Sequence, residues 1–161
     1  MEYNHFTYGT LLATKHKSLT PTHYFTCSES DNLQSLVERL SSVHSTILIA
    51  LDGKNSDFDF NESERLTKRP QYFFMVLAPA ALDNSNAILA AQAKCEAIAL
   101  QLQARMMLDH RKYLNGLTCL LPGTFTIRGI GPVGDNLFGV IMGFNVEYGV
   151  TYTIDNTQWD A

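Results

Sequence analysis

The sequence has few of the residues that mark several large classes of protein. Only three cysteines occur among 161 residues, at long and irregular spacings and without a C-x-x-C pair. An odd count at such spacings is typical of reduced thiols in a reducing compartment and argues against a disulfide framework. Basic residues are also scarce, with 12 Lys and Arg against 16 Asp and Glu. The resulting net charge of −4 argues against a broad phosphate-binding surface, and so against a nucleic-acid partner.

Long apolar runs are missing as well. No window approaches the roughly 18 apolar residues of a membrane-spanning helix. The N-terminus, MEYNHFTYGT, has neither the basic region nor the apolar core of a signal peptide. We therefore expect a protein that stays in a cytoplasm-like compartment and has no membrane partner. With 45% hydrophobic and 17% charged residues, the chain can form a single domain, residues 1–161, with its own core.

Helical periodicity is present in three segments, residues 3–17, 31–44 and about 84–113. The second has apolar residues at i, i+3, i+4 and i+7, and the third is opened by the polar cluster Asp83, Asn84 and Ser85. Alanines along the third helix raise its helix propensity and keep it slim. The apolar stripe of the second helix consists of Leu33, Leu36, Val37, Leu40 and Val43, and one face of the third carries Ile88, Ala91, Cys95, Ile98, Leu102 and Met106.

Strand patterns alternate with these helices. Residues 46–52 and 71–79 are nearly continuous apolar runs, typical of interior strands. Residues 23–27 indicate a short extended piece, and residues 124–130 a strand that follows a turn at 121–123 and precedes a loop at 131–136. This order of elements predicts an α+β fold, with helices packed on one face of a mostly antiparallel sheet.

A charged segment, residues 53–69, separates the two apolar strands. Its acidic residues come mostly before its basic residues, and its length is unusual for a loop in a compact domain. Two interpretations stay open: a solvated hairpin loop, or a contact arm whose acidic and basic halves meet complementary patches elsewhere. Phe58 and Phe60 favour the arm, because solvated segments are poor in aromatic residues. The charged residues expected in its contacts are Glu62, Arg65, Lys68 and Arg69.

A possible nucleotide-binding motif lacks the context that its chemistry needs. Gly129, Gly131 and Gly134 spell G-x-G-x-x-G after a predicted strand. That fingerprint binds a pyrophosphate through the N-terminal amides of a following helix, whereas Asp135 and Asn136 lead into a strand. We expect a glycine-bearing connection between strands and no nucleotide cofactor.

Other catalytic and metal-binding patterns are also incomplete. His16, His23 and Cys27 do not make up the four ligands, or three and a water, of a zinc site. Asp109 and His110 point to adjacent faces of the predicted helix, so they do not form a dyad. No base is identified beside any cysteine that would activate it as a nucleophile. We therefore expect no metal, no cofactor, no catalytic residue and no enzymatic activity.

The most distinctive feature is the ribbon FGVIMGFNVEYGVTYTI, residues 138–154, where every second residue is apolar nine times in a row. This period indicates a strand, which at roughly 3.3 Å per residue would span on the order of 55 Å. Either Gly149 bends it into two strands, or part of it projects and pairs with a neighbouring copy. Glycines on the opposite face, Gly139, Gly143 and Gly149, would let another backbone or helix approach closely. A head-to-tail contact of this kind can close a ring.

The C-terminal segment DNLFGVIMGFNVEYGVTYTIDNTQW resembles the last strands of phage tail terminator or tail-completion proteins. The expected order of helices and strands over most of the chain is similar to that family's α+β plan. The resemblance implies a non-enzymatic virion protein, assembled in the host cytoplasm and located at the tail or neck. Its copies would form a ring, typically a hexamer, that caps the tail tube, stops its polymerisation and presents a surface to the neck.

Ring assembly through the ribbon and the charged segment assigns an interface to specific residues. A terminator and another neck or head-completion protein both stay open, and so does a small ligand-binding or catalytic domain with a pocket between the long helix and the sheet. In the ring model, the ribbon supplies buried sheet and intersubunit contact, while residues 53–69 touch the next subunit or the tube. The expected interface residues are Phe58, Phe60, Glu62, Arg65, Lys68, Arg69, Phe144, Val146, Tyr148, Val150 and Tyr152.

Overall fold

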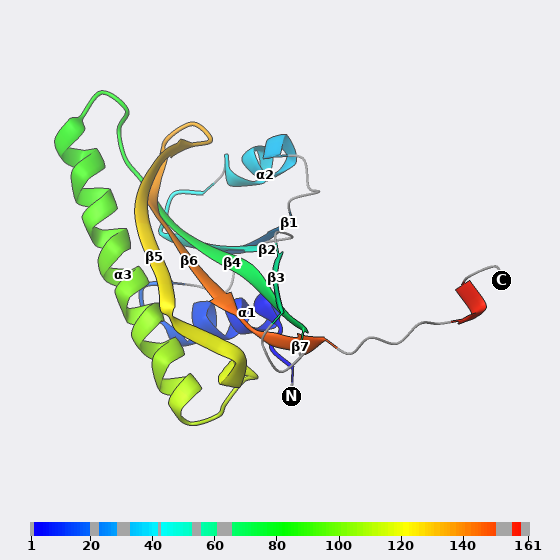
Figure 1. The fold of residues 1–161 in the computed structure, drawn as a ribbon. Coiled ribbons are helices and arrows are strands. Elements are labelled where there is room, and N and C mark those ends of the chain that lie inside the picture. Colours follow the sequence, from blue (N-terminus) through cyan, green and yellow to red (C-terminus); the bar gives the residue numbers. More distant parts are fainter. Residues whose placement is uncertain are drawn as a thin grey trace.

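The computed structural model describes residues 2–19, 23–28, 33–41, 43–52, 56–60, 66–150 and 156–158. They form a mixed sheet, mostly antiparallel, with helices packed against it, so the protein is α+β as expected (Figure 1). The helices are α1 (His5–Lys15), α2 (Leu33–Leu40) and α3 (Ser85–Arg111), with the short 3-10 helices η2 (Leu117–Cys119) and η3 (Asn156–Gln158). The strands are β1 (Tyr24–Ser28), β2 (Ile47–Asp52), β3 (Ser56–Phe60), β4 (Leu66–Pro79), β5 (Leu120–Val133), β6 (Leu137–Val146) and β7 (Tyr148–Val150).

Asparagine caps begin the two helices that the sequence predicts at 3–17 and 84–113. The Asn4 side chain accepts a hydrogen bond from the Thr7 amide at 2.9 Å, at the start of α1. The Asn84 side chain accepts one from the Ala87 amide at 3.0 Å, at the start of α3. Each cap satisfies a backbone donor that the first helical turn leaves without a partner. The predicted helices are thus confirmed, with ends shifted by one or two residues.

The main sheet has the strand order β1-β2-β4-β6-β5, with β1 parallel to β2 and the other neighbours antiparallel. The predicted ribbon supplies an interior strand, β6, hydrogen bonded to β4 on one side and to β5 on the other. The ribbon is split into β6 and β7, as one interpretation held, but at Glu147 and not at Gly149. Residues 151–154 of the ribbon lie outside the described part of the chain.

Two apolar clusters lie on the two faces of this sheet. On one face, α1 and α3 cover side chains such as Phe74, Val140 and Phe144. On the other face, Leu40 at the end of α2 and Val43 just after it pack with strand residues. Helices therefore lie on both faces of the sheet. All helices were expected on one face, which is correct for α1 and α3 but wrong for α2. The amphipathic pattern of residues 31–44 indicates a buried side but does not say which face of the sheet it covers.

β5 forms one edge of the main sheet and is irregular along its length. Its register against β6 shifts twice, between Leu121 and Thr126 and between Ile130 and Val133. The predicted turn at 121–123 lies at the first irregularity, and the strand continues through it. The predicted loop at 131–136 lies at the second irregularity, and the strand extends as far as Val133. The glycine motif lies where β5 meets β6, and a strand follows it as expected.

A buried carboxylate joins α1 to the C-terminal end of α3. Asp109 is 1% exposed, and its Oδ2 accepts hydrogen bonds from the Tyr8 hydroxyl at 2.8 Å and the Asn115 amide at 3.0 Å. Arg105 Nε lies 3.0 Å from Oδ1, which neutralises the buried charge. His110 points elsewhere, with Nδ1 2.8 Å from the Leu117 carbonyl oxygen. Asp109 and His110 thus do not face each other, and Asp109 is a structural joint.

Candidate assembly surface

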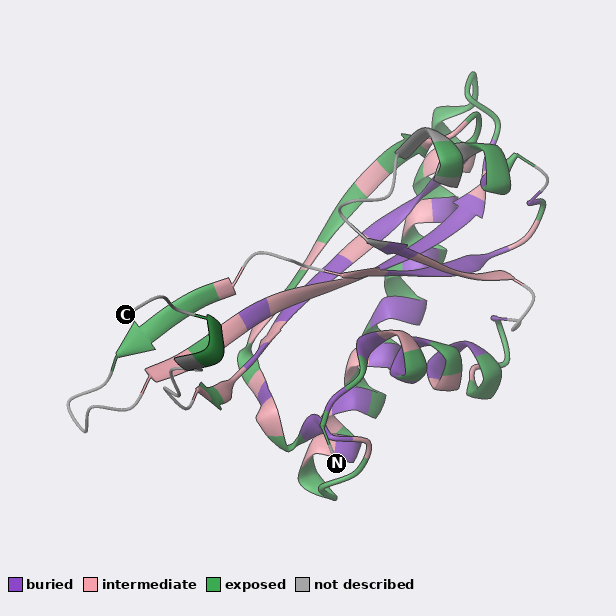
Figure 2. Cartoon of the chain, turned by 90° about the vertical axis from the view of Figure 1, so that its right-hand side faces the viewer, coloured by how far each residue is buried: buried purple, intermediate pink, exposed green. Residues whose placement is uncertain are grey.

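The predicted charged loop is largely a β-structured arm. β3 pairs antiparallel with the first residues of β4, 66–70, and β7 pairs with β4 on its other side. We call these three pieces, β3, residues 66–70 and β7, the arm. Figure 2 shows it at one end of the sheet, beyond the helices, with β3 exposed. The loop interpretation is therefore wrong for residues 56–60 and 66–69, while residues 53–55 and 61–65, including Glu62 and Arg65, lie outside the described residues.

One face of the arm is mainly apolar and is not covered by the described chain. Residues directly opposite each other in an antiparallel pair share a face. The register places Phe60 beside Leu66 and Leu66 beside Val150, and it places Phe58 beside Lys68 and Lys68 beside Tyr148. The two phenylalanines are 60% and 59% exposed. We call the set Phe58, Phe60, Leu66, Tyr148 and Val150 the arm's apolar face.

This face continues the helix-covered face of the main sheet. Side chains alternate along β4, so Leu66 and Lys68 point to the same side as Tyr72 and Phe74. Phe74 is fully buried under α1 and α3, whereas Leu66 is half-buried and Lys68 exposed. The arm thus extends an apolar surface beyond the helices that cover it in the body of the protein.

The opposite face of the arm is charged and internally paired. Arg69 lies 3.0 Å from Asp59 and 2.6 Å from Glu147, which links β4 to β3 and to the junction between β6 and β7. The hydrogen bond to Glu147 raises the pKa of the Arg69 guanidinium, followed by smaller effects of both carboxylates. The segment was expected to meet complementary charges elsewhere in the protein. Arg69 does so with Glu147, which lies outside residues 53–69, but it also pairs with Asp59 inside the segment.

A hollow of about 550 Å³ lies between the base of the arm and the N-terminal segment. Tyr72 and Tyr148 are among its lining residues, together with Lys68, Asp52 and Glu2. Burial raises the pKa of the Tyr148 hydroxyl, and the nearby Cys119 thiol raises it further. Tyr148 therefore stays neutral at physiological pH and adds aromatic, uncharged area to the arm.

The central ribbon residues do not lie on this surface. Phe144 and Val146 are 0% exposed within the single chain, packed under the helices. Their assignment to an intersubunit contact is wrong, because the chain covers them itself. Tyr148 and Val150, by contrast, are half-buried on the arm. Tyr152 lies outside the described residues.

The ribbon glycines in the main sheet also differ from the one on the arm. A Cβ at Gly139 would collide with the Val76 carbonyl oxygen of β4, and one at Gly143 would lie 2.9 Å from Thr126 Oγ1 and 3.0 Å from the Phe73 ring. The close approach predicted at these positions is therefore made by the chain's own strands. Gly149, on the arm, has open space around its Cα.

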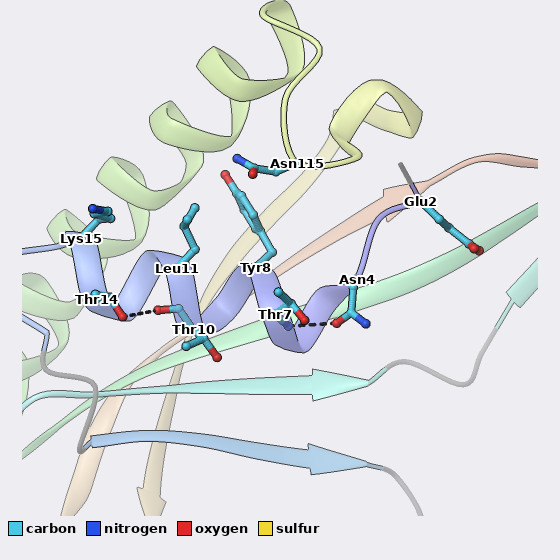
Figure 3. A pocket seen from close by; sticks show the side chains of 9 residues that line it. All are labelled: Glu2, Asn4, Thr7, Tyr8, Thr10, Leu11, Thr14, Lys15 and Asn115. Atoms are coloured by element: carbon cyan, nitrogen blue, oxygen red, sulfur yellow. Dashed lines mark hydrogen bonds between the residues drawn. The ribbon is translucent and has the colours of Figure 1, made fainter.

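The space between α3 and the sheet, where a ligand pocket was considered, is filled by core side chains such as Cys95, Leu102 and Met142. A pocket of about 430 Å³ lies instead along the outer side of α1 (Figure 3). Leu11 and Tyr8 point into the space between α1 and α3, and Asn115 faces Tyr8 from the turn after α3. Thr7, Thr10 and Thr14 of α1 are half of its remaining lining residues, with Glu2, Asn4 and Lys15.

The histidine and cysteine candidates stay apart. Within the described residues, no three His, Cys, Asp or Glu side chains are grouped as a metal site would require. His16 Nδ1 accepts a hydrogen bond from the Ser18 amide, while His23 Nδ1 lies 2.8 Å from Ser45 Oγ. Cys27 is buried on the face that α2 covers. None of the three contributes to the arm.

Sequence reasoning missed His5, a buried histidine at the start of α1. The Phe73 carbonyl can only accept, so His5 Nε2 donates to it at 2.9 Å, and Nδ1 of the neutral ring accepts from the Tyr3 hydroxyl at 2.9 Å. Burial lowers the pKa of His5 to about 4, which the hydrogen bond to Phe73 only partly offsets. The ring packs against Tyr72 and Phe74, with centroids 4.7 and 4.4 Å away.

Replacing His5 with Gln is expected to reduce the loss of unfolding free energy that occurs as the pH falls below 7. The folded pKa of about 4 lies below the unfolded value of 6.5, so the unfolded state binds the proton first and stability falls as pH drops through this window. For His5 alone the loss between pH 7 and pH 5 is about 2 kcal/mol. Urea unfolding of wild type and His5→Gln at both pH values measures the difference.

The matched control for this measurement is His16→Gln. Burial also lowers the pKa of His16, so it acts in the same direction, but its burial is only partial and its effect should be smaller. An unchanged pH dependence in His5→Gln would contradict the assignment of this window to His5.

No protein-family model matches the chain, and no curated protein matches it significantly. Among the described residues, no helix is long and apolar enough to cross a membrane.

Proposed function

We propose that the protein is a structural subunit whose copies associate through the arm into a ring that caps a phage tail tube and joins it to the neck. The observation that supports assembly is the arm's apolar face, which projects beyond the helices and exposes two phenylalanines by 60% and 59%. Contiguous exposed apolar side chains on a projecting element are typical of a protein contact site. The tail and neck role comes from the resemblance of residues 135–159 to tail terminator proteins.

The arm supports this proposal more directly than the ribbon as a whole. On the face of the arm opposite the phenylalanines, Arg69 forms ion pairs with Asp59 and Glu147, and these pairs hold the strands of the arm in place. A surface that is already ordered loses less conformational entropy on association. The predicted contact residues that remain on the surface are Phe58, Phe60, Lys68, Arg69, Tyr148 and Val150, with Glu62, Arg65 and Tyr152 outside the described residues.

The test is the mass of the purified protein with and without the tube protein of the same virus. We expect particles of several chains, each of 18.0 kDa, alone or on the tube, and we expect the ring to stop tube elongation. The variant Phe58→Thr/Phe60→Thr should stay at the mass of one chain and leave elongation unchecked, because threonine suits a strand but removes the aromatic contact. Light scattering after size exclusion and electron microscopy of tube lengths give the two measurements.

The outcomes separate the parts of the proposal. Wild-type protein that keeps the mass of one chain at high concentration and with tubes present would contradict assembly. An assembled ring that leaves tube length unchanged would contradict the terminator role and favour another neck or head-completion protein.

The pocket along α1 favours a second candidate, a small ligand-binding domain. Its volume of about 430 Å³ is within the roughly 300–1,000 Å³ of small-molecule sites. Under this alternative, the protein would remain a single chain and a ligand would raise its melting temperature. A screen of small molecules by thermal shift tests it, and Leu11→Glu, which fills the pocket with a charge, should abolish any shift.

A further inference from the structure

The outer face of α3 has a second uncovered apolar surface. From Leu89 to Leu108, six exposed apolar side chains recur at spacings of four, four, three, four and four residues, which places them within a roughly 100°-wide arc. The leucines are 63%, 49% and 43% exposed in chain order. We call the set Leu89, Ala93, Ala97, Leu100, Ala104 and Leu108 the α3 stripe.

The fold of the single chain does not account for this stripe. The opposite side of α3 already packs on the sheet through residues such as Ile98, Leu102 and Met106. A helix at the surface normally has polar side chains on its outward face, and one that is apolar on two opposite faces is normally covered on both. The described residues leave the stripe uncovered, so a further molecule is needed to bury it.

The arm and the stripe lie on opposite sides of the protein. In Figure 1, α3 forms one flank of the molecule, while β3 and β7 lie at the other. Two different apolar surfaces so placed suit a head-to-tail contact, in which each copy offers its arm to one neighbour and its stripe to the other. Repetition of such a contact closes a ring when the rotation between copies allows it.

Shape and charge favour the same pairing. The three alanines leave shallow gaps between the leucines, into which the rings of Phe58 and Phe60 can pack. On the arm's apolar face, the exposed charged side chain is Lys68, which lies between Phe58 and Tyr148, whereas Asp57 and Asp59 alternate with the phenylalanines and point to the opposite face. An arm-against-arm contact would bring the Lys68 ammonium groups of two copies together, whereas the stripe itself consists of uncharged leucines and alanines. Like-charge repulsion thus disfavours arm against arm and favours the pairing of arm with stripe.

We propose that the arm of one copy packs its apolar face on the α3 stripe of the next copy. This inference rests on the proposed function only in requiring that copies assemble through the arm. It adds the counterpart surface, for which the occupant is a second copy of the same chain.

The test mixes two variants that each lack one half of the contact. Phe58→Thr/Phe60→Thr removes the aromatic contact of the arm and keeps the stripe. Ala97→Glu/Leu100→Glu places charges in the stripe and keeps the arm. All four positions are exposed, and Glu has good helix propensity, so both variants should keep the wild-type melting temperature. Leu82→Glu is the matched control, since Leu82 is 61% exposed before α3 and outside the stripe.

Each variant alone should have the mass of one chain, and the control should assemble like wild type. An equimolar mixture of the two variants should form particles of twice the 18.0 kDa chain mass and no larger. The reason is that the mixture contains one intact arm and one intact stripe, so a single junction forms and cannot propagate. Light scattering after size exclusion measures these masses.

Three results would overturn the inference, and they differ from failure of the proposed function. A stripe variant that assembles like wild type would show that α3 is not the counterpart, although the arm is still needed. A stripe variant that stops at two chains alone would point to arm-against-arm contact. A mixture that stays at the mass of one chain would mean that arm and stripe do not meet. Wild-type protein that never assembles would instead contradict the proposed function itself.

Discussion

Phe144→Ala is expected to lower the free energy of unfolding by about 3–5 kcal/mol. Phe144 is fully buried at the centre of an aromatic cluster, with ring centroids of Tyr3, Tyr72, Phe74 and Phe125 within 6.2 Å. Truncation removes the apolar area of the ring and leaves a cavity that rigid neighbouring rings fill poorly. Urea unfolding at neutral pH measures the change.

The same experiment decides between a core role and an interface role for this residue. Phe58→Thr/Phe60→Thr is the comparison, because these phenylalanines are exposed and their loss should change the assembly but not the free energy of unfolding. If Phe144→Ala kept wild-type stability and lost only assembly, the ribbon would be an interface after all. The cluster around Phe144 predicts the opposite.

Gly139→Ala is expected to destabilise the fold by about 3 kcal/mol, although it adds a single methyl group. Gly139 lies opposite Leu77 in the pairing of β6 with β4. A Cβ there would collide with the Val76 carbonyl oxygen and lie 3.0 Å from the Leu77 Cα. These are backbone atoms of a central strand and cannot move aside as a flexible side chain can. Thermal and urea unfolding of the variant test this expectation.

Gly149→Ala provides the matched control for this substitution. It places the same methyl group on the same predicted ribbon, but no atom lies within 4 Å of the added Cβ. Its stability should stay within about 0.5 kcal/mol of wild type, as is usual for exposed sites. Equal losses in both variants would mean that β6 and β4 do not pair as described.

Local signals in the sequence predicted most of the helices and strands. Asn84 belongs to the polar cluster that is expected to open the long helix, and its side chain caps α3. The apolar runs 46–52 and 71–79 became β2 and the buried half of β4, since continuous apolar runs are typical of strands covered on both faces. These features depend on neighbouring residues alone, which is why sequence patterns suffice for them.

The sequence leaves open whether the ribbon splits or projects, for a reason that lies beyond local pattern. Alternation indicates one apolar face, but it does not say what covers that face. In the structure, α1 and α3 cover β6, and β5 extends over residues 120–133 to pair with it. The length of β5 was hidden by Pro122 and Pro132, which are typical of turns but lie in an irregular edge strand here.

The arm and the stripe were both visible in the sequence through weaker signals. Residues 56–60, SDFDF, alternate polar and aromatic side chains, which is a strand pattern that the surrounding charges obscured. A helical projection of residues 85–111 places Leu89, Leu100 and Leu108 on the side opposite the buried face. The partners of both surfaces depend on the folded arrangement, so no spacing rule could have identified them.

The irregular edge formed by β5 limits how copies of this protein can meet. A long regular edge strand would accept a strand from another molecule and grow into open-ended fibres. Two register shifts distort the hydrogen-bonding row of β5, and Pro122 and Pro132 lack amide donors. Fibrous aggregation from this side is thereby discouraged. In the proposed assembly, side-chain contacts at the arm would then set both the number of neighbours and the point at which growth ends.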